Sequence, residues 1–293
     1  MAEPFCGSFA VNEVDSAVDV DAIIVGAPYE DKCEIYPVGT ALAPKKIREI
    51  STFFSGQSFS EQSIHQLNVL DFGDTREGLS YPDFQNEFSE KIATILRKNA
   101  LPIILGGDHS IALGTAKGIQ NSGMEFDSIV WIDAHLDLMN KYPNGNKFSR
   151  ATVLRRIIEL DNFSTKQVYF IGSRGHNLGW EEIELVNSNK MKVLKANSFS
   201  LEDEIENFIK NIITKHKNVY VSVDIDVLDP VFAPGISVPE PGGLTSRELF
   251  SIIEKLAKVI GCFEIVEVNP KIDINNLTSM VACKTIFSLL DAI

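Results

Sequence analysis

The sequence is poor in cysteine and has no paired-cysteine motif. Its 293 residues include only Cys6, Cys33, Cys262 and Cys283, and none of them forms a Cys-x-x-Cys pair. This spacing matches neither a zinc pattern nor a disulfide framework, and it fits a reducing compartment. We therefore expect a cytoplasmic protein whose fold does not depend on cysteine-bound zinc.

Long apolar runs and an excess of positive charge are also missing. No apolar run approaches the roughly 20 residues of a membrane span, and residues 1–21 are acidic where a signal peptide would be basic. The 27 Lys and Arg against 40 Asp and Glu give a net charge of −13. We therefore expect no nucleic acid as partner, because nucleic acids attract basic proteins. We expect no membrane as partner, because a spanning run is missing. The negative charge aids solubility and weakly favours a cationic small molecule.

No linker, repeat or charge block interrupts the chain, so residues 1–293 are predicted to form one domain. Short β-branched runs alternate with helical patterns, which is typical of an α/β protein with a parallel sheet covered by helices on both faces. The sequence predicts eight strands, at residues 22–28, 66–73, 102–107, 128–135, 167–173, 192–196, 218–226 and 262–269.

Amphipathic stretches between these runs predict helices, for example at residues 84–99, 201–216 and 245–261. The last of them opens with Thr245 and Glu248 at capping-box spacing, and its end is predicted at Gly261.

Three predicted strands end in clusters of Asp and His. These clusters read GGDHS (106–110), DAHLD (133–137) and DID (224–226). Parallel strands bring their carboxyl ends to one edge of the sheet, where ligands bind, so the clusters are predicted to converge. Taken alone, GGDHS fits equally a phosphate-binding loop or a helix start at Asp108 and Ser110.

Alternation along extended backbone places Asp133, His135 and Asp137 on one side, and likewise Asp224 and Asp226. With His109 this makes four carboxylates and two imidazoles. Oxygen ligands with a minority of nitrogen suit Mn²⁺ better than structural zinc. Six ligands exceed the needs of one open site, which favours two ions bridged by shared carboxylates.

The motifs GGDHS, DAHLD and SVDIDVLDPVFAPG resemble the three signatures of the ureohydrolases, the arginase and agmatinase family. The resemblance runs from GAPYEDKCEIYPVGT through IGSRG to EIVEVNP, which is nearly the whole chain. It implies a three-layer α/β/α fold with an eight-stranded parallel sheet, an arginase-like fold, usually trimeric or hexameric. It also implies hydrolysis of a guanidino or formimino group with two Mn²⁺ per chain.

Carried over residue by residue, the resemblance implies one ion held by His109, Asp133, Asp137 and Asp224, and a second held by Asp133, His135, Asp224 and Asp226. Asp133 and Asp224 would bridge the two. Asp226 would also steady the tetrahedral intermediate, and Glu267 would accept the guanidinium of the substrate.

Three positions depart from the family pattern. Arg150 stands where a proton-shuttling histidine is common, and arginine cannot exchange a proton near neutral pH. Val238 replaces a threonine expected near the guanidinium, and Val227 replaces a glycine. Either Arg150 recognises an anionic group, or His176 takes over the proton role, or hydrolysis is weak or lost.

The leading functional hypothesis is a binuclear manganese amidinohydrolase, most like agmatinase, that releases urea from a small guanidino compound. The segment after DAHLD lacks the serine- and asparagine-rich loop with which arginases hold an α-amino acid. Formimidoylglutamase, guanidino-acid hydrolase and arginase are alternatives of the same class. The alternative of another class is a non-catalytic, metal-binding regulatory homologue.

Overall fold

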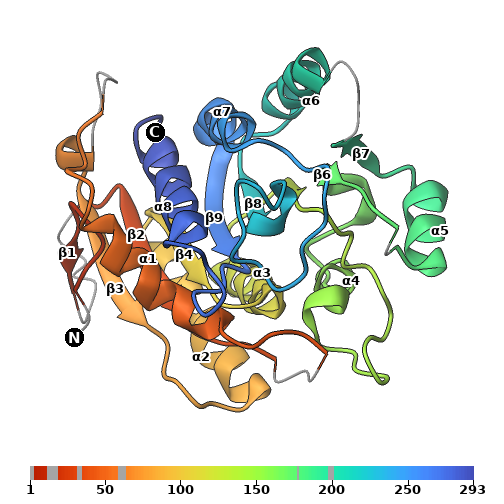
Figure 1. Cartoon of the computed structure of the whole chain (residues 1–293), viewed down its shortest axis with the longest axis horizontal. Helices are drawn as coiled ribbons and strands as arrows, with labels where there is room; N and C mark the ends of the chain where they lie inside the picture. The colour runs from red at the N-terminus through yellow and green to blue at the C-terminus, as the bar shows by residue number, and fades with distance from the viewer. Residues whose placement is uncertain (1–2, 12–18, 32–34, 59–63, 177, 197–200) are drawn as a thin grey trace.

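A parallel sheet of nine strands runs through the protein (Figure 1). The computed structural model describes residues 3–11, 19–31, 35–58, 64–176, 178–196 and 201–293. Within these residues the strand order is β1-β3-β2-β4-β9-β8-β5-β6-β7, and every neighbouring pair is parallel. The strands are β1 (Phe9–Ala10), β2 (Ala22–Ala27), β3 (Val69–Asp74), β4 (Leu101–Gly106), β5 (Ser128–Ile132), β6 (Val168–Ser173), β7 (Lys192–Lys195), β8 (Val219–Asp224) and β9 (Ile260–Val266).

All eight predicted strands are present, but the predicted count of eight is wrong because β1 adds a ninth. This strand has two exposed residues, too few to produce an alternating pattern. Tertiary contacts hold it in place. Phe5 is fully buried, and its backbone N–H donates to Asp71 Oδ2 on β3 at 2.9 Å. Phe9 then pairs with Leu70 in parallel register.

Helices cover both faces of the sheet, which confirms the predicted three-layer α/β/α architecture (Figure 1). One layer contains α1 (Ala43–Ser51), α6 (Leu201–Lys215), α7 (Ser246–Leu256) and α8 (Leu277–Leu290). The opposite layer contains α2 (Tyr81–Arg97), α3 (Ala112–Ser122), α4 (Val153–Ile157) and α5 (Trp180–Asn189).

Alternating strand residues divide the core into two apolar layers. On β2, Ala22 and Ile24 pack in the layer with α1 and α8, whereas Ile23 and Val25 pack with α2 and α3. All six residues of β2 are buried. A strand buried on both faces needs a continuous apolar run rather than apolar–polar alternation, and this accounts for the sequence pattern.

The predicted capping box of α7 is confirmed, but its predicted end is wrong. Thr245 Oγ1 accepts the backbone N–H of Glu248 at 3.2 Å, and Glu248 Oε2 accepts the N–H of Thr245 at 2.7 Å. The helix ends at Leu256 rather than Gly261, which belongs to β9. A Cβ at position 261 would lie 1.6 Å from Asn218 Oδ1, so the glycine serves a close strand contact rather than a helix stop.

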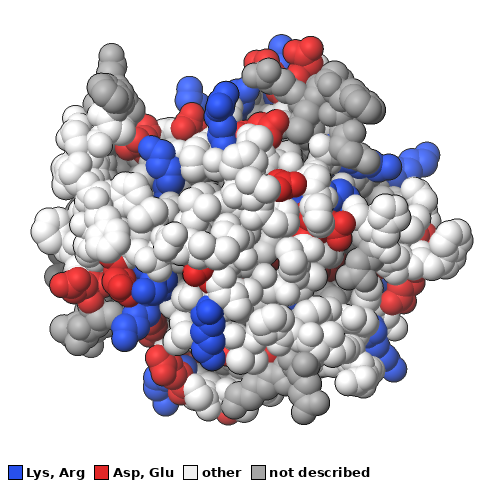
Figure 2. All heavy atoms as spheres, in the orientation of Figure 1, with Lys and Arg blue, Asp and Glu red and all other residues white. Residues whose placement is uncertain are grey.

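Among the described residues, no helix is both long and apolar enough to cross a membrane. On the face shown in Figure 2, acidic and basic side chains are interspersed. Cys6, Cys262 and Cys283 are free thiols, and Cys33 lies outside the described residues.

Candidate metal centre and active site

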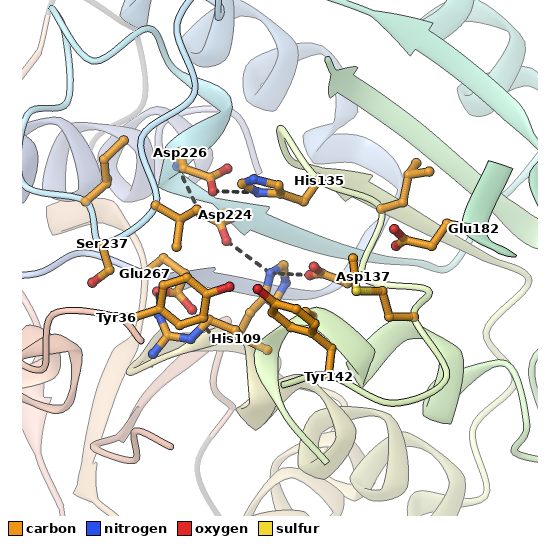
Figure 3. Close-up of a pocket in the computed structure, with 16 residues that line it drawn as sticks. Tyr36, His109, His135, Asp137, Tyr142, Glu182, Asp224, Asp226, Ser237 and Glu267 are labelled. Atoms are coloured by element: carbon orange, nitrogen blue, oxygen red, sulfur yellow. Dashed lines mark hydrogen bonds and ion pairs between the residues drawn. The ribbon is translucent and has the colours of Figure 1, made fainter. Parts of the chain in front are cut away.

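Four strands that are neighbours in the sheet, in the order β4-β9-β8-β5, end at the same place. Their carboxyl ends carry the predicted site residues: His109 after β4, Glu267 after β9, Asp224 at the end of β8 with Asp226 beyond it, and Asp133, His135 and Asp137 after β5. Figure 3 shows the labelled side chains of His109, His135, Asp137, Asp224, Asp226 and Glu267 gathered around one cavity. The predicted convergence of the three motifs is therefore observed.

The backbone at these strand ends takes conformations that the sequence pattern does not reveal. Glu267 and Asp137 adopt positive φ angles of 67° and 53°, which aim their side chains inward. At Gly107 a Cβ would lie 1.9 Å from the carbonyl oxygen of Tyr29, so only glycine fits. Asp108 Oδ1 then accepts the N–H of Ser110 at 2.9 Å and starts the turn that carries His109. GGDHS is therefore a helix start that also presents a site histidine.

His109 lies among three carboxylates. Its Nδ1 is 3.2 Å from Asp133 Oδ2, 3.1 Å from Asp137 Oδ2 and 3.2 Å from Asp224 Oδ2. On its far side the ring stacks on Trp131, with the two ring centroids 4.1 Å apart.

The other ring nitrogen of His109 is held by a relay of hydrogen bonds. His109 Nε2 is 2.8 Å from Ser222 Oγ, and Ser222 Oγ donates to Glu264 Oε1 at 2.7 Å. Because the Ser222 proton goes to Glu264, its oxygen accepts from His109 Nε2–H. This tautomer turns the lone pair of Nδ1 toward the three carboxylates.

A cation held among these four atoms would stabilise an imidazole nitrogen that lies so close to three carboxylate oxygens. Among the described residues, His109 Nδ1 and Asp133 Oδ2 are buried atoms without a hydrogen-bond partner. These donor atoms fit a divalent cation of the manganese type, which accepts carboxylate oxygen and imidazole nitrogen together. In a metal-free chain a proton would have to take that place.

A second group of ligands surrounds His135. Its Nδ1 is 2.9 Å from Asp226 Oδ2 and 3.5 Å from Asp133 Oδ1. Asp226 is fixed by the backbone, since its Oδ1 accepts the N–H of Ala134 at 3.2 Å and its own N–H donates to Asp224 Oδ1 at 2.9 Å. Asp133 therefore faces both His109 and His135. Asp224 likewise contacts both ligand groups, through His109 in the first and Asp226 in the second.

The six predicted ligands therefore form two overlapping clusters. His109, Asp133 and Asp137 offer ligand atoms within 4.8 Å of one another, and so do Asp133, His135 and Asp226. Asp224 belongs to neither of these triplets, but it lies beside His109 in the first cluster.

The titration of these groups reflects crowded negative charge. Burial lowers the pKa of His109, but its contacts with Asp133, Asp137 and Asp224 outweigh burial and raise that pKa well above the ordinary value. For His135, burial again lowers the pKa, and Asp226 and Asp133 raise it far more. Burial and the charge of Asp133 raise the pKa of Asp137 to about 8. Without metal ions, protons must neutralise the cluster.

Arg150 forms a buried ion pair with Glu267. Its Nη1 donates to Glu267 Oε2 at 2.6 Å, and its Nη2 donates to Asp108 Oδ2 at 3.3 Å. The guanidinium carbon lies 5.2 Å from the centre of the Tyr36 ring. Burial raises the pKa of Glu267 to about 7, against the opposing effect of the Arg150 charge.

A cavity of about 560 Å³, part of it open to solvent, lies over the cluster. Tyr36, Tyr142, Ser237 and Glu182 line it together with the predicted site residues (Figure 3). Sequence reasoning missed these four because they come from loops or, for Glu182, from a helix with no motif. Only the loop position of the tyrosines, near the strand ends, could have suggested them.

The remaining predicted positions differ in their placement. Val238 lines the cavity. His176 is exposed in the turn after β6 and is not among the described residues that line the cavity. Val227 packs on Gly172, where an added Cβ would lie 2.3 Å from Val227 Cγ2. The larger residue at position 227 thus fits because position 172 is glycine.

The central strand ends of this α/β/α sheet gather carboxylates and histidines into a candidate site for divalent metal ions. The arginase family model matches residues 20–291, and the chain belongs to the arginase family. It is accordingly a hydrolase that acts on C–N bonds in linear amidines.

Several relatives match along nearly their whole length. An uncharacterized 32.2 kDa protein of Methanothermus fervidus is 37% identical over 278 residues, covering 92% of this chain and 91% of the relative. Agmatinase of Bacillus subtilis is 30% identical over 296 residues, covering 98% and 97%. The crystal structure of agmatine ureohydrolase of Thermoplasma volcanium matches with a TM-score of 0.84 and 27% identity, covering 97% of this chain and 94% of that one.

Proposed function

We propose that the chain is a binuclear manganese amidinohydrolase that cleaves a small guanidino compound and releases urea. The observation that carries this proposal is the position of His109 Nδ1, which lies within 3.2 Å of an oxygen of each of three buried carboxylates. His109, Asp133, Asp137 and Asp224 would hold one ion, and Asp133, His135, Asp224 and Asp226 the other.

Two divalent cations, when bound, supply the Lewis acidity that activates water for attack on an amidine carbon. The chain's own residues position this chemistry. Asp226, anchored by two backbone contacts, offers a carboxylate that can steady a proton beside the reacting carbon. Glu264 and Ser222 keep His109 in the tautomer that can ligate.

Two substrate classes remain as candidates. The similarity to agmatinases supports an agmatine-like compound, whose second end is an amine. The ion pair of Arg150 with Glu267 favours a guanidino acid instead, because it places a cation at the carboxylate that was predicted to receive the substrate's guanidinium.

The proposal is tested by a product assay on the manganese-loaded protein. Urea would be measured with agmatine, arginine and 4-guanidinobutyrate, and formamide with formiminoglutamate. We expect turnover of at least one compound, with loss of more than about 100-fold in Asp226→Asn, because the substitution removes a ligand charge. Asp161→Asn, an exposed carboxylate, is the matched control and should keep full activity. Two bound ions without turnover of any compound would favour the regulatory homologue.

Manganese binding should release protons and become tighter as pH rises. The raised pKa values of His109 and His135, and that of Asp137 at about 8, leave these groups protonated in the metal-free protein at pH 7. Ligation requires the deprotonated forms, so raising the pH removes the competing protons. Titration calorimetry in two buffers of different ionisation enthalpy measures the protons released. An affinity for Mn²⁺ that does not change between pH about 6 and about 8 would contradict the protonated state.

A further inference from the structure

Glu267, the carboxylate predicted to receive the substrate's guanidinium, has both of its oxygens engaged by the chain. Its Oε1 accepts the backbone N–H of His109 at 2.8 Å, and its Oε2 accepts Arg150 Nη1 at 2.6 Å. A second guanidinium at Oε2 would lie beside the positive charge of Arg150, which repels it. The chain thus supplies its own cation at this position.

Arg150 is built into the cavity wall. Arg150 is only 8% exposed and lines the cavity together with Glu267 and Tyr36. It lies in the turn that begins at Ser149, whose N–H donates to Thr152 Oγ1 at 2.9 Å. Glu267 and Asp108 hold two corners of the guanidinium, so its plane is fixed rather than free to rotate.

The guanidinium keeps hydrogen-bond donors that these two carboxylates do not use. Arg150 has five N–H donors, and within the described residues its Nε is a buried nitrogen without a hydrogen-bond partner. A buried donor of this kind costs free energy unless a ligand accepts its hydrogen bond. The best acceptor for a guanidinium is an anion with two oxygens, such as a carboxylate, because its two oxygens match the paired N–H groups.

Charge balance leads to the same ligand. Arg150 lines the same cavity as the predicted ligands Asp224 and Asp226, and it is a buried positive charge there. A substrate with a cationic guanidinium and a cationic tail would bring two further positive charges into the cavity with Arg150. A guanidino acid brings no net charge, and its carboxylate can pair with the free donors.

We propose that Arg150 is a specificity-determining residue that binds the carboxylate of the substrate and so selects linear amidines with an anionic tail over those with an amine. The inference rests on the proposed function of the same site and names its substrate class. Glu267 is then a positioning residue that holds Arg150, rather than the group that receives the substrate's guanidinium.

The experiment compares two compounds that share a guanidinium and differ at the other end. 4-Guanidinobutyrate ends in a carboxylate and agmatine ends in an amine. With the manganese-loaded protein we expect kcat/KM to be about 10- to 100-fold higher for the acid, the range expected for hydrogen bonds to a charged group. In Arg150→Gln this ratio should fall by a similar factor through a higher KM for the acid. Arg150→Lys should keep part of the preference for the acid. Arg155 lies outside the cavity, so Arg155→Gln is the matched control and should leave the ratio unchanged.

A binding measurement keeps the outcome clear if no compound is hydrolysed. In thermal denaturation of the metal-free parent protein, 4-guanidinobutyrate should raise Tm more than agmatine does. Absence of turnover with this binding preference intact would defeat the proposed function and leave the role of Arg150 standing. Turnover of agmatine at least equal to that of 4-guanidinobutyrate, with no binding preference for the acid, would overturn the inference while the hydrolase assignment stands.

Discussion

Replacing Asp133 by Asn should abolish hydrolysis and leave the chain unable to hold two manganese ions. The Asp133 oxygens face His109 at 3.2 Å and His135 at 3.5 Å, so this one side chain contacts both clusters. An amide is neutral and presents one oxygen, which removes both a charge and a shared ligand. Mutation of a residue that only orients a metal ligand lowers activity about 10- to 100-fold. Because Asp133 is itself a predicted ligand, we expect its substitution to lower activity by more than about 100-fold.

Metal analysis by mass spectrometry after exhaustive dialysis checks this directly, alongside urea release. The matched control is Asp203→Asn on α6, an exposed carboxylate that should retain both ions and full activity. Two tightly bound ions in Asp133→Asn would show that this carboxylate does not bridge them.

Removing Asp71 should cause the largest loss of stability outside the site. Asp71 Oδ2 accepts Arg48 Nε at 2.8 Å, and Oδ1 accepts Nη2 at 2.9 Å, with Arg48 only 2% exposed. Asp71→Ala leaves the guanidinium of Arg48 buried with Asp74 as its remaining carboxylate partner. It also removes the acceptor of the Phe5 N–H. We expect a decrease of about 3–5 kcal/mol in the free energy of unfolding.

The change would be measured as the shift in urea unfolding midpoint of the metal-free protein, so that ion binding does not contribute. Glu49→Gln provides the comparison, because Glu49 pairs with Lys46 on the surface and should cost less than about 1 kcal/mol. Equal losses for the two variants would mean that the buried pair adds nothing beyond a surface contact.

The sequence predicts the sheet well because each strand carries its own local pattern. Every run of β-branched residues that was predicted as a strand is one, since a doubly buried strand must be apolar throughout. The edge strand β1 escapes prediction because Phe9 and Ala10 are held by partners elsewhere in the chain rather than by their own pattern. The end of α7 was predicted too late because Gly261 looked like a helix stop. This glycine instead lies in β9, where the side chain of Asn218 leaves no room for a Cβ.

The candidate site shows the same division between local and distant information. His109, Asp133 and Asp226 lie in motifs whose short-range spacing could be read directly, and the structure brings them together. The contact of Arg150 with Glu267 joins residues 117 positions apart, and no local rule links them. Sequence comparison could notice an arginine in an unusual place, but only the fold reveals which carboxylate it meets.

The strand order also affects when the predicted metal ligands can come together during folding. Among the described strands, β9 alone joins the half-sheet β1-β3-β2-β4 to the half-sheet β8-β5-β6-β7. Five of the six predicted ligands lie at or just after the ends of β5 and β8 in the second half, whereas His109 follows β4 in the first. Because β9 is the last strand in the sequence, we expect His109 to join the other five ligands only after residues 260–266 have been synthesised, so the ligand group around His109 is completed late in folding.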